Sequence, residues 1–439
     1  MTAENYQNNT DSSDRYMTRY SSPVFNRGLE LAKKVSLATP DRHQEQLFSN
    51  KFIQDAEYFY NLALPQISPS EYQHALINLQ QALDLNPDYY EAYIIRYSLI
   101  YMPLGYYQEA ISDCTQVLRL NSKNAEAIIN RGWAYAQQGY HLQALQDYDL
   151  ALIIKPNFEI AYMNRGLSYM RCNNYQKAID DFQQVLKINP HSADAYNNKG
   201  LILLHLEKYQ DALSNLEKAI QINSEHVQAY LNTGLCYFYL NNNFLVAKNF
   251  SNAIDLSPEI TKEYLTQWDE DADRDDNTLS SYIALTLVNA GVNFQKKSNY
   301  QKALVYYNHA IVLNPDLENA YCKRGAVYAQ IGDIEAAISD FDRVVEFGNE
   351  NPWAYLMRAK LYYQLGYNSQ GEKDDIIAYM LLGNQLSASG NYTEAIESYT
   401  TALEIDPNNS EAYNRRSTAR SAIGDYQGAM EDLQRVRII

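Results

Sequence analysis

The chain repeats a short pattern of residues at a spacing of 34, and no other feature constrains its fold as strongly. The triplet Asn130–Gly132 returns as Asn164–Gly166, and related triplets stand at 198–200 and 232–234. A repeat of this length is typical of a solenoid, in which each unit contacts only its neighbours. We therefore expect an extended surface that holds another molecule, rather than an enclosed pocket.

The residues within one unit predict two helices packed closely together. When Gly132 is counted as the eighth residue of its unit, the eighth, twentieth and twenty-seventh residues are small and let the helices approach. The fourth residue is often tyrosine, which accounts for much of the total of 40 Tyr. Tyrosine combines a large apolar body with one polar tip and so suits a thin two-layer core. Proline follows the second helix in several units and prevents its continuation.

With this spacing of small, aromatic and proline residues, the chain resembles the tetratricopeptide repeat (TPR) family, in an array of the bacterial type. The resemblance implies an all-α fold, an α-solenoid in which helix-turn-helix repeats form a right-handed superhelix. It implies a protein-binding surface but names no partner, because one repeat fold serves unrelated roles.

Composition limits the classes of partner. The net charge of −17 argues against nucleic-acid binding, which needs a basic surface. No window is long and apolar enough for membrane insertion, and the first residues lack the apolar stretch of a secretory signal. The four cysteines fall in different repeats without the spacing of a metal site or a disulfide framework. We therefore expect a cytoplasmic protein without a cofactor or bound metal.

The repeat register divides the chain into five parts. Residues 1–25 are predicted to be disordered, and 26–55 to form an N-terminal helical cap. A first array over 56–260 has six units, of which the first is degenerate, and one extra residue near Met102 and Pro103 should bulge a helix. An acidic linker is expected over 261–283. A second array over 284–439 has five units, one of them truncated near 352–375, where one helix over about 370–387 should serve two units.

The resemblance implies that the first helix of each unit lines the concave groove. Asparagine is the sixth residue of four consecutive units, and a line of amides could pair with the backbone of an extended peptide. Asparagine is also common there as a water-facing consensus residue, and both readings are open. Among the apolar residues, Trp133 is the strongest candidate for contact with a bound peptide, since tryptophan is enriched at binding hot spots. The predicted peptide-binding groove consists of Asn130, Asn164, Asn198, Asn232, Trp133, Met163, Leu167, Met170, Leu201, Leu231, Leu235, Phe238 and Tyr239.

The second array presents a more polar and basic set of side chains, which could hold an acidic segment. It does not supply the residues of the two-carboxylate clamp found in chaperone-binding TPR domains. The predicted secondary surface consists of Lys323, Trp353, Lys360, Arg415, Arg416 and Arg420.

The leading functional hypothesis is a non-catalytic adaptor or assembly scaffold that holds an extended or helical segment of a protein partner. One alternative is a structural scaffold that self-associates, because the chain ends in the apolar stretch Arg435–Ile439 and could form a homo-oligomer there. Another is a co-chaperone without the carboxylate clamp. An enzyme is disfavoured, because the first groove has almost no titratable side chains and the chain carries no phosphate-binding or nucleophile motif.

Overall fold

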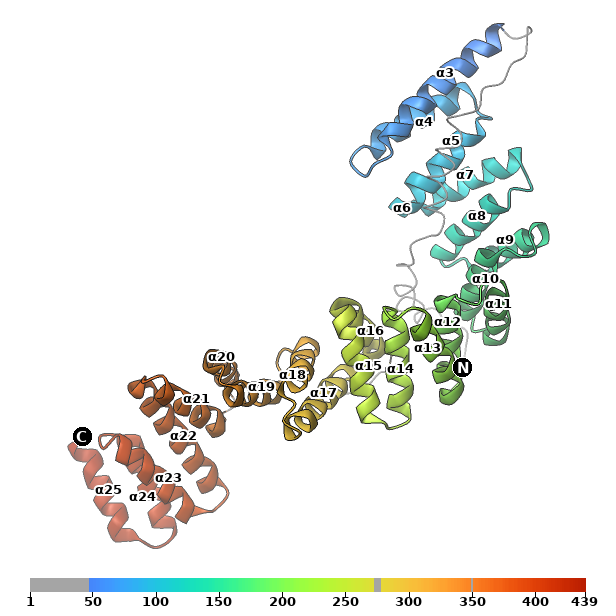
Figure 1. The fold of residues 1–439 in the computed structure, drawn as a ribbon. Helices are drawn as coiled ribbons and strands as arrows, with labels where there is room; N and C mark the ends of the chain where they lie inside the picture. Colours follow the sequence, from blue (N-terminus) through green and yellow to red (C-terminus); the bar gives the residue numbers. More distant parts are fainter. Residues whose placement is uncertain (1–46, 272–277, 349) are drawn as a thin grey trace, which may run out of the picture. The chain divides into compact units, whose positions relative to one another are not determined.

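The computed structural model describes residues 47–271, 278–348 and 350–439, and every regular element in these ranges is a helix. Helices follow one another as pairs joined by short turns (Figure 1). The all-α solenoid fold predicted from the 34-residue period is confirmed. The chain divides into two compact units, residues 1–240 and 241–439, which are described separately. The predicted segment 1–25 and most of the predicted cap over 26–55 lie outside the described residues.

The first unit begins with α3 (Leu47–Ala63), which ends just before Pro65 in the short helix η2 (Leu64–Gln66). Its remaining helices are α4 (Tyr72–Leu85), α5 (Tyr90–Ile95), η3 (Arg96–Tyr101), α6 (Met102–Leu104), α7 (Tyr107–Leu120), α8 (Ala125–Gln137), α9 (His141–Ile154), α10 (Glu159–Arg171), α11 (Tyr175–Ile188), α12 (Ala193–His205), α13 (Tyr209–Ile222) and α14 (Val227–Tyr239).

The extra residue near Met102 is absorbed by a helical bulge, as predicted. The segment η3 is a π-helix, whose wider turn accommodates one additional residue without ending the helix.

The second unit contains α15 (Asn243–Leu256), α16 (Pro258–Asp271), α17 (Leu279–Lys296), α18 (Tyr300–Leu313), α19 (Glu318–Ile331), α20 (Ile334–Glu346), α21 (Pro352–Gln364), α22 (Asn368–Ala388), α23 (Tyr392–Ile405), α24 (Ser410–Ala422) and α25 (Tyr426–Ile438). The helix α22 is 21 residues long and packs against both α21 and α23. It occupies the place where the sequence suggested one helix shared by two repeats.

The expectation of an acidic linker over 261–283 does not match the structure. Residues up to Asp271 belong to α16, which packs against α15 and α17 and buries Tyr264 and Leu265. Asp269 accepts hydrogen bonds from the backbone N–H of Leu279 and Ser280, where α17 begins. The acidic segment therefore contains an amphipathic helix, α16, whose apolar side is part of the core. The division into two arrays with these boundaries stays a prediction.

Close approach of the paired helices explains the glycine at the eighth position. A Cβ atom placed on Gly132 would lie 2.8 Å from the ring of Tyr148, and one on Gly166 would lie 2.8 Å from the ring of Phe182. Both rings belong to the second helix of the same repeat and are fully buried. The first helices often begin with a side-chain cap: the Asn124 side chain, for example, accepts hydrogen bonds from the backbone N–H of Glu126 and Ala127.

Candidate functional site

The first helices of successive repeats contact one another and build a continuous face in each unit. In the first unit these contacts join α8 to α10, α10 to α12 and α12 to α14. In the second unit they join α17 to α19, α19 to α21 and α22 to α24. Side chains that project from these helices and stay accessible are therefore the candidates for binding a partner.

The predicted asparagine line is mostly part of the packing between first helices. Asn130, Asn198 and Asn232 are buried, and only Asn164 is half-buried. The Asn232 amide donates a hydrogen bond of 2.9 Å to the Asn197 side chain of the preceding first helix. Asn130 donates to the Tyr97 hydroxyl at 3.4 Å. Because neighbouring helices cover these amides, the predicted asparagine line is not open to the backbone of a bound peptide.

Replacing Asn232 with alanine should therefore lower stability rather than weaken binding. The Asn232 side chain is 1% exposed, and the Asn197 amide oxygen would be left without its donor. Leaving a buried polar group unpaired costs about 1–3 kcal/mol. Urea denaturation followed by circular dichroism measures the change, and Asn164→Ala serves as the matched control. Equal stability of the two variants would contradict the packing role.

The apolar groove residues fall into two groups. Leu231 and Leu235 are fully buried and Met170 is 9% exposed, so these three are core residues and not contact residues. The others remain half-buried or exposed on the first-helix face and form what we call the apolar strip: Trp133, Met163, Leu167, Leu201, Phe238 and Tyr239. The strip runs over α8, α10, α12 and α14 and offers apolar side chains from four consecutive repeats.

Aromatic contacts hold parts of the strip in place. The Trp133 ring packs edge-on against Tyr107 of α7, with ring centroids 5.6 Å apart. Tyr239 stacks on Tyr209 of α13 at 5.3 Å. Rings fixed by a neighbouring repeat lose little freedom when a ligand packs on their open side, which favours binding.

A recurring arginine clasp, which the sequence analysis missed, connects the helices behind this face. Arg165 forms a two-fold hydrogen-bonded pair with Asp181 of α11, at 2.9 and 2.6 Å. Its remaining nitrogen reaches Asp149 of the preceding repeat at 2.6 Å. Its guanidinium also lies over the rings of Tyr162 and Tyr169. Hydrogen bonds to Asp181 raise the pKa of Arg165, so its guanidinium stays charged.

Within the described ranges, the same clasp recurs in six repeats. The arginine stands at the seventh position, and its aspartate partner lies 16 residues later, or 17 where the π-helix adds a residue. Lys199, Thr233 and Ala290 replace the arginine in three consecutive repeats. The pairs are Arg96–Asp113, Arg131–Asp147, Arg165–Asp181, Arg324–Asp340, Arg358–Asp374 and Arg416–Asp432.

The clasp changes the interpretation of the secondary basic surface. Arg416 is committed to Asp432, and Arg420 contacts both Asp432 and the Gly428 carbonyl. Arg415 is exposed and pairs with Glu411 one turn earlier. These three arginines therefore have internal partners that an acidic ligand would have to displace.

Two lysines and a tryptophan of this surface remain available. Lys323 is half-buried, Lys360 and Trp353 are exposed, and in the described part of the chain neither lysine forms an ion pair. Trp353 packs on the edge of Phe341, with ring centroids 5.6 Å apart.

A hydrogen-bond chain in the second unit joins α15 to α18, with Ser251 and His309 buried and Asp255 exposed. His309 Nδ1 lies 2.9 Å from the Ser251 hydroxyl, and its Nε2 lies 3.1 Å from Asp255. The residue types are those of a hydrolase triad, but Ser251 is 5% exposed and cannot be reached by a substrate. The chain therefore links two helices and is no nucleophilic site.

Acid should weaken this link. Burial lowers the pKa of His309, and Asp255 opposes the shift. Since an unfolded histidine titrates near 6.5, the unfolded chain takes up the proton first, and this part of the stability is lost as pH falls through the lowered pKa. We expect the melting temperature of the wild type to fall more between about pH 7 and 5 than that of His309→Gln. Parallel pH profiles of the two would contradict this.

No helix in the described ranges combines the length and apolar character needed to cross a membrane.

Fold and site together define a helical-repeat protein in which the first helices of successive repeats form continuous faces. The tetratricopeptide repeat description matches residues 99–157, 160–192, 193–226 and 318–347, and the description TPR repeat matches 294–332 and 383–417. The chain belongs to the tetratricopeptide repeat family.

Relatives share segments of this repeat. The chain is 31% identical over 111 residues to small glutamine-rich tetratricopeptide repeat-containing protein 2 of Mycosarcoma maydis, covering 25% of each chain. It is 24% identical over 161 residues to the tetratricopeptide repeat and J domain-containing co-chaperone DNJ1 of Cryptococcus neoformans, covering 32% of this chain and 31% of the relative. The matches thus span a third or less of these relatives. Among solved structures, YrrB, a TPR protein with an unusual peptide-binding site, is 24% identical with a TM-score of 0.33, covering 47% of this chain and 95% of YrrB.

Proposed function

We propose that the protein is a non-catalytic adaptor that holds an apolar segment of a partner protein against the apolar strip of its first unit. One observation carries this proposal: the apolar strip continues over α8, α10, α12 and α14, the first helices of four consecutive repeats, and each of these helices contacts the next. The buried asparagines shift the expected mode of binding from backbone pairing to side-chain contact. Accessible Met163 adds an adaptable side chain suited to more than one apolar sequence.

Selection from a random peptide library displayed on phage tests this proposal. Wild type should enrich peptides with several apolar residues, and a Leu167→Lys/Leu201→Lys variant should not, because each lysine places a charge on the strip. The lysine stem covers much of the same apolar surface, which preserves the fold. The matched control is Leu150→Lys/Ile153→Lys, two exposed residues on α9. Enrichment of the same peptides by the groove variant would refute the proposal.

A second face supports a weaker candidate. Lys323, Lys360 and Trp353 in the second unit suit an acidic segment with a large apolar residue, and the first two have no internal ion pair in the described ranges. The co-chaperone alternative also stays a proposal. The relative from Cryptococcus neoformans is named a co-chaperone, and that name describes the relative only. The assembly role and the cytoplasmic location stay predictions.

A further inference from the structure

In three of the clasps, those of Arg165, Arg324 and Arg358, the arginine lies between two tyrosine rings of its own helix. The tyrosines stand three residues before and four residues after the arginine, and each ring centroid is between 5.3 and 6.0 Å from the guanidinium carbon. The third arm of each guanidinium reaches a side-chain oxygen 16 residues upstream. These clasps show how this protein surrounds a guanidinium group.

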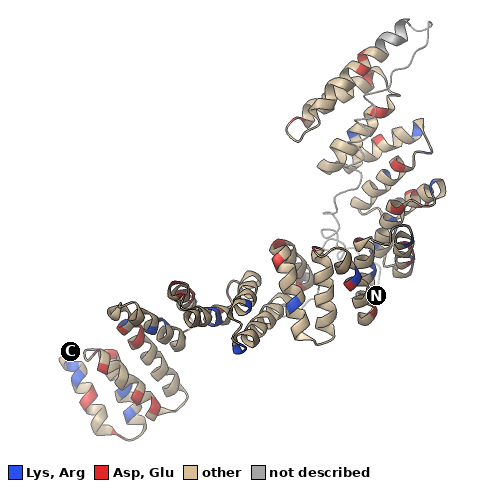
Figure 2. Cartoon of the chain, in the orientation of Figure 1, with Lys and Arg blue, Asp and Glu red and all other residues tan. Residues whose placement is uncertain are grey.

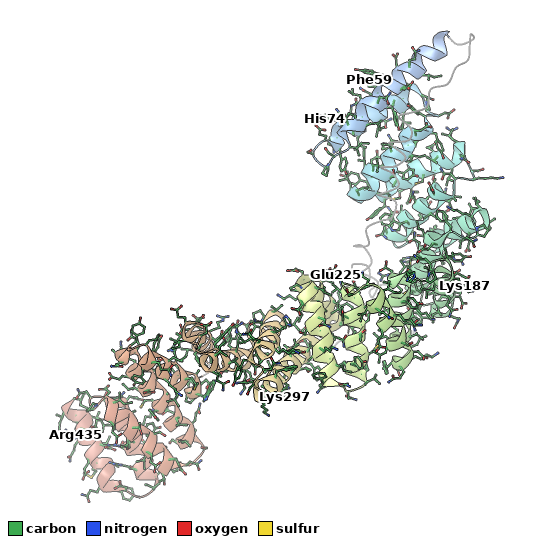
Figure 3. All side chains as sticks on the ribbon, in the orientation of Figure 1. Phe59, His74, Lys187, Glu225, Lys297 and Arg435 are labelled. Atoms are coloured by element: carbon green, nitrogen blue, oxygen red, sulfur yellow. The ribbon has the colours of Figure 1, made fainter. Side chains whose placement is uncertain are left out.

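One repeat has the same surroundings without the arginine. In α14, Tyr230 and Tyr237 have the spacing of the two clasp tyrosines, but Thr233 stands at the arginine position. Glu217 of α13 is 16 residues upstream of Thr233 and so takes the place of the third partner. The helix α14 itself carries no charged residue (Figure 2), and Glu225 marks the turn that joins it to α13 (Figure 3).

The two tyrosines and the carboxylate are accessible. Tyr230 and Tyr237 are half-buried, and Glu217 is exposed. Burial raises the pKa of Tyr237, and the negative charge of Glu217 adds to this effect, as that of Asp149 does for Tyr169 in the Arg165 clasp. Glu217 therefore lies near its tyrosine, as the clasp acid does. In the described part of the chain, no lysine or arginine pairs with Glu217 or lies over either ring of α14.

The residue at the arginine position limits how deep a ligand can lie. Thr233 is 3% exposed, and its hydroxyl donates a 2.6 Å hydrogen bond to the Ala229 carbonyl. A cation at this place therefore contacts the outer parts of the two rings and not the helix backbone. Such an open position suits a side chain of a larger molecule, because sites for free small molecules are concave and bury most of their ligand.

We propose that Tyr230, Tyr237 and Glu217 bind the guanidinium of an arginine side chain that a protein partner supplies. A planar guanidinium stacks on aromatic faces and donates two parallel hydrogen bonds to one carboxylate, which an ammonium group does not. The net charge of −17 also attracts basic partners. The site uses no residue of the apolar strip, so this proposal is independent of the groove proposal.

Saturation-transfer NMR of the full chain with N-acetyl-arginine N-methylamide as the probe tests the site. Wild type should bind the probe, and Glu217→Gln and Tyr237→Leu should each raise the Kd at least about threefold, because each removes one contact with the cation. The control Glu207→Gln removes an exposed carboxylate from the turn before α13 and should bind like wild type. A wild type that does not bind the probe, or equal Kd values for Glu217→Gln and Glu207→Gln, would overturn the proposal.

Two further measurements test the ligand and its position. Free L-arginine should bind no more tightly than the blocked probe, because the site contacts only the guanidinium. Tighter binding of free arginine would show a small-molecule site and contradict a partner side chain. Thr233→Arg gives α14 the arginine of the clasp repeats and should abolish binding of the probe, whereas unchanged binding would show that the probe lies elsewhere. Because Thr233 is buried, Glu217→Gln remains the deciding variant where Thr233→Arg does not fold.

Discussion

Replacing Arg324 with alanine is expected to lower the free energy of unfolding by about 3–5 kcal/mol, because it leaves the buried carboxyl group of Asp340 without its charged partner. Arg324 donates two hydrogen bonds to Asp340, at 2.9 and 2.6 Å, and a third to Asn308 of the preceding repeat at 2.7 Å. Burial raises the pKa of Asp340, and the hydrogen bonds from Arg324 act against that shift. The arginine is therefore what lets the carboxylate remain ionised in the core. Urea denaturation followed by circular dichroism measures the loss.

Two further variants separate the clasp from a general effect of charge. Arg343→Ala removes an arginine from an exposed pair with Glu346 on α20 and should cost much less stability, because exposed ion pairs contribute little. Arg324→Lys keeps the charge but cannot make the two-fold pair, so its stability should fall between the others. Because repeats interact with nearest neighbours, hydrogen exchange should accelerate mainly in α18, α19 and α20 of Arg324→Ala. Equal losses in Arg324→Ala and Arg343→Ala would contradict the structural role of the clasp.

Replacing Gly383 with valine is expected to cost about 3 kcal/mol, because the new side chain has no room. A Cβ atom on Gly383 would lie 2.5 Å from the ring of Tyr399. That ring cannot swing away easily, since it is 1% exposed and its hydroxyl donates a 2.9 Å hydrogen bond to Asn384. Thermal unfolding of Gly383→Val compared with Ala388→Val, an exposed position on the same helix, isolates the steric effect. Equal melting temperatures would show that the helices separate without cost.

The sequence predicts those parts of the fold that depend on local spacing. The helix pairs follow from the 34-residue period, and the π-helix follows from one residue too many near Met102. The helix α16 was missed because its acidic composition suggested a linker. A helical spacing was nevertheless present, because Tyr264 and Leu265 follow Thr261 by three and four residues. All three side chains are buried.

The candidate site was predicted less well, because accessibility depends on how neighbouring repeats meet. Asn164 and Asn232 occupy the same position in their repeats, yet the first is half-buried and the second is covered. No pattern within one repeat distinguishes them. The arginine clasp was visible as Arg and Asp at a separation of 16, or 17 at the π-helix, but its meaning requires knowing that the two positions face each other across a helix pair.

The reach of each clasp into the preceding repeat sets a rule for dividing this chain into fragments. Arg165 needs Asp149, Arg324 needs Asn308 and Arg358 needs Asp342, and each of these third partners lies 16 residues upstream, in an earlier helix pair. A fragment that begins at the first helix of a repeat therefore loses one arm of its first clasp, whereas one that begins a helix earlier keeps it. The smallest piece that keeps one clasp complete is accordingly three helices long, and cutting points that preserve the clasps lie in the middle of repeats and not between them.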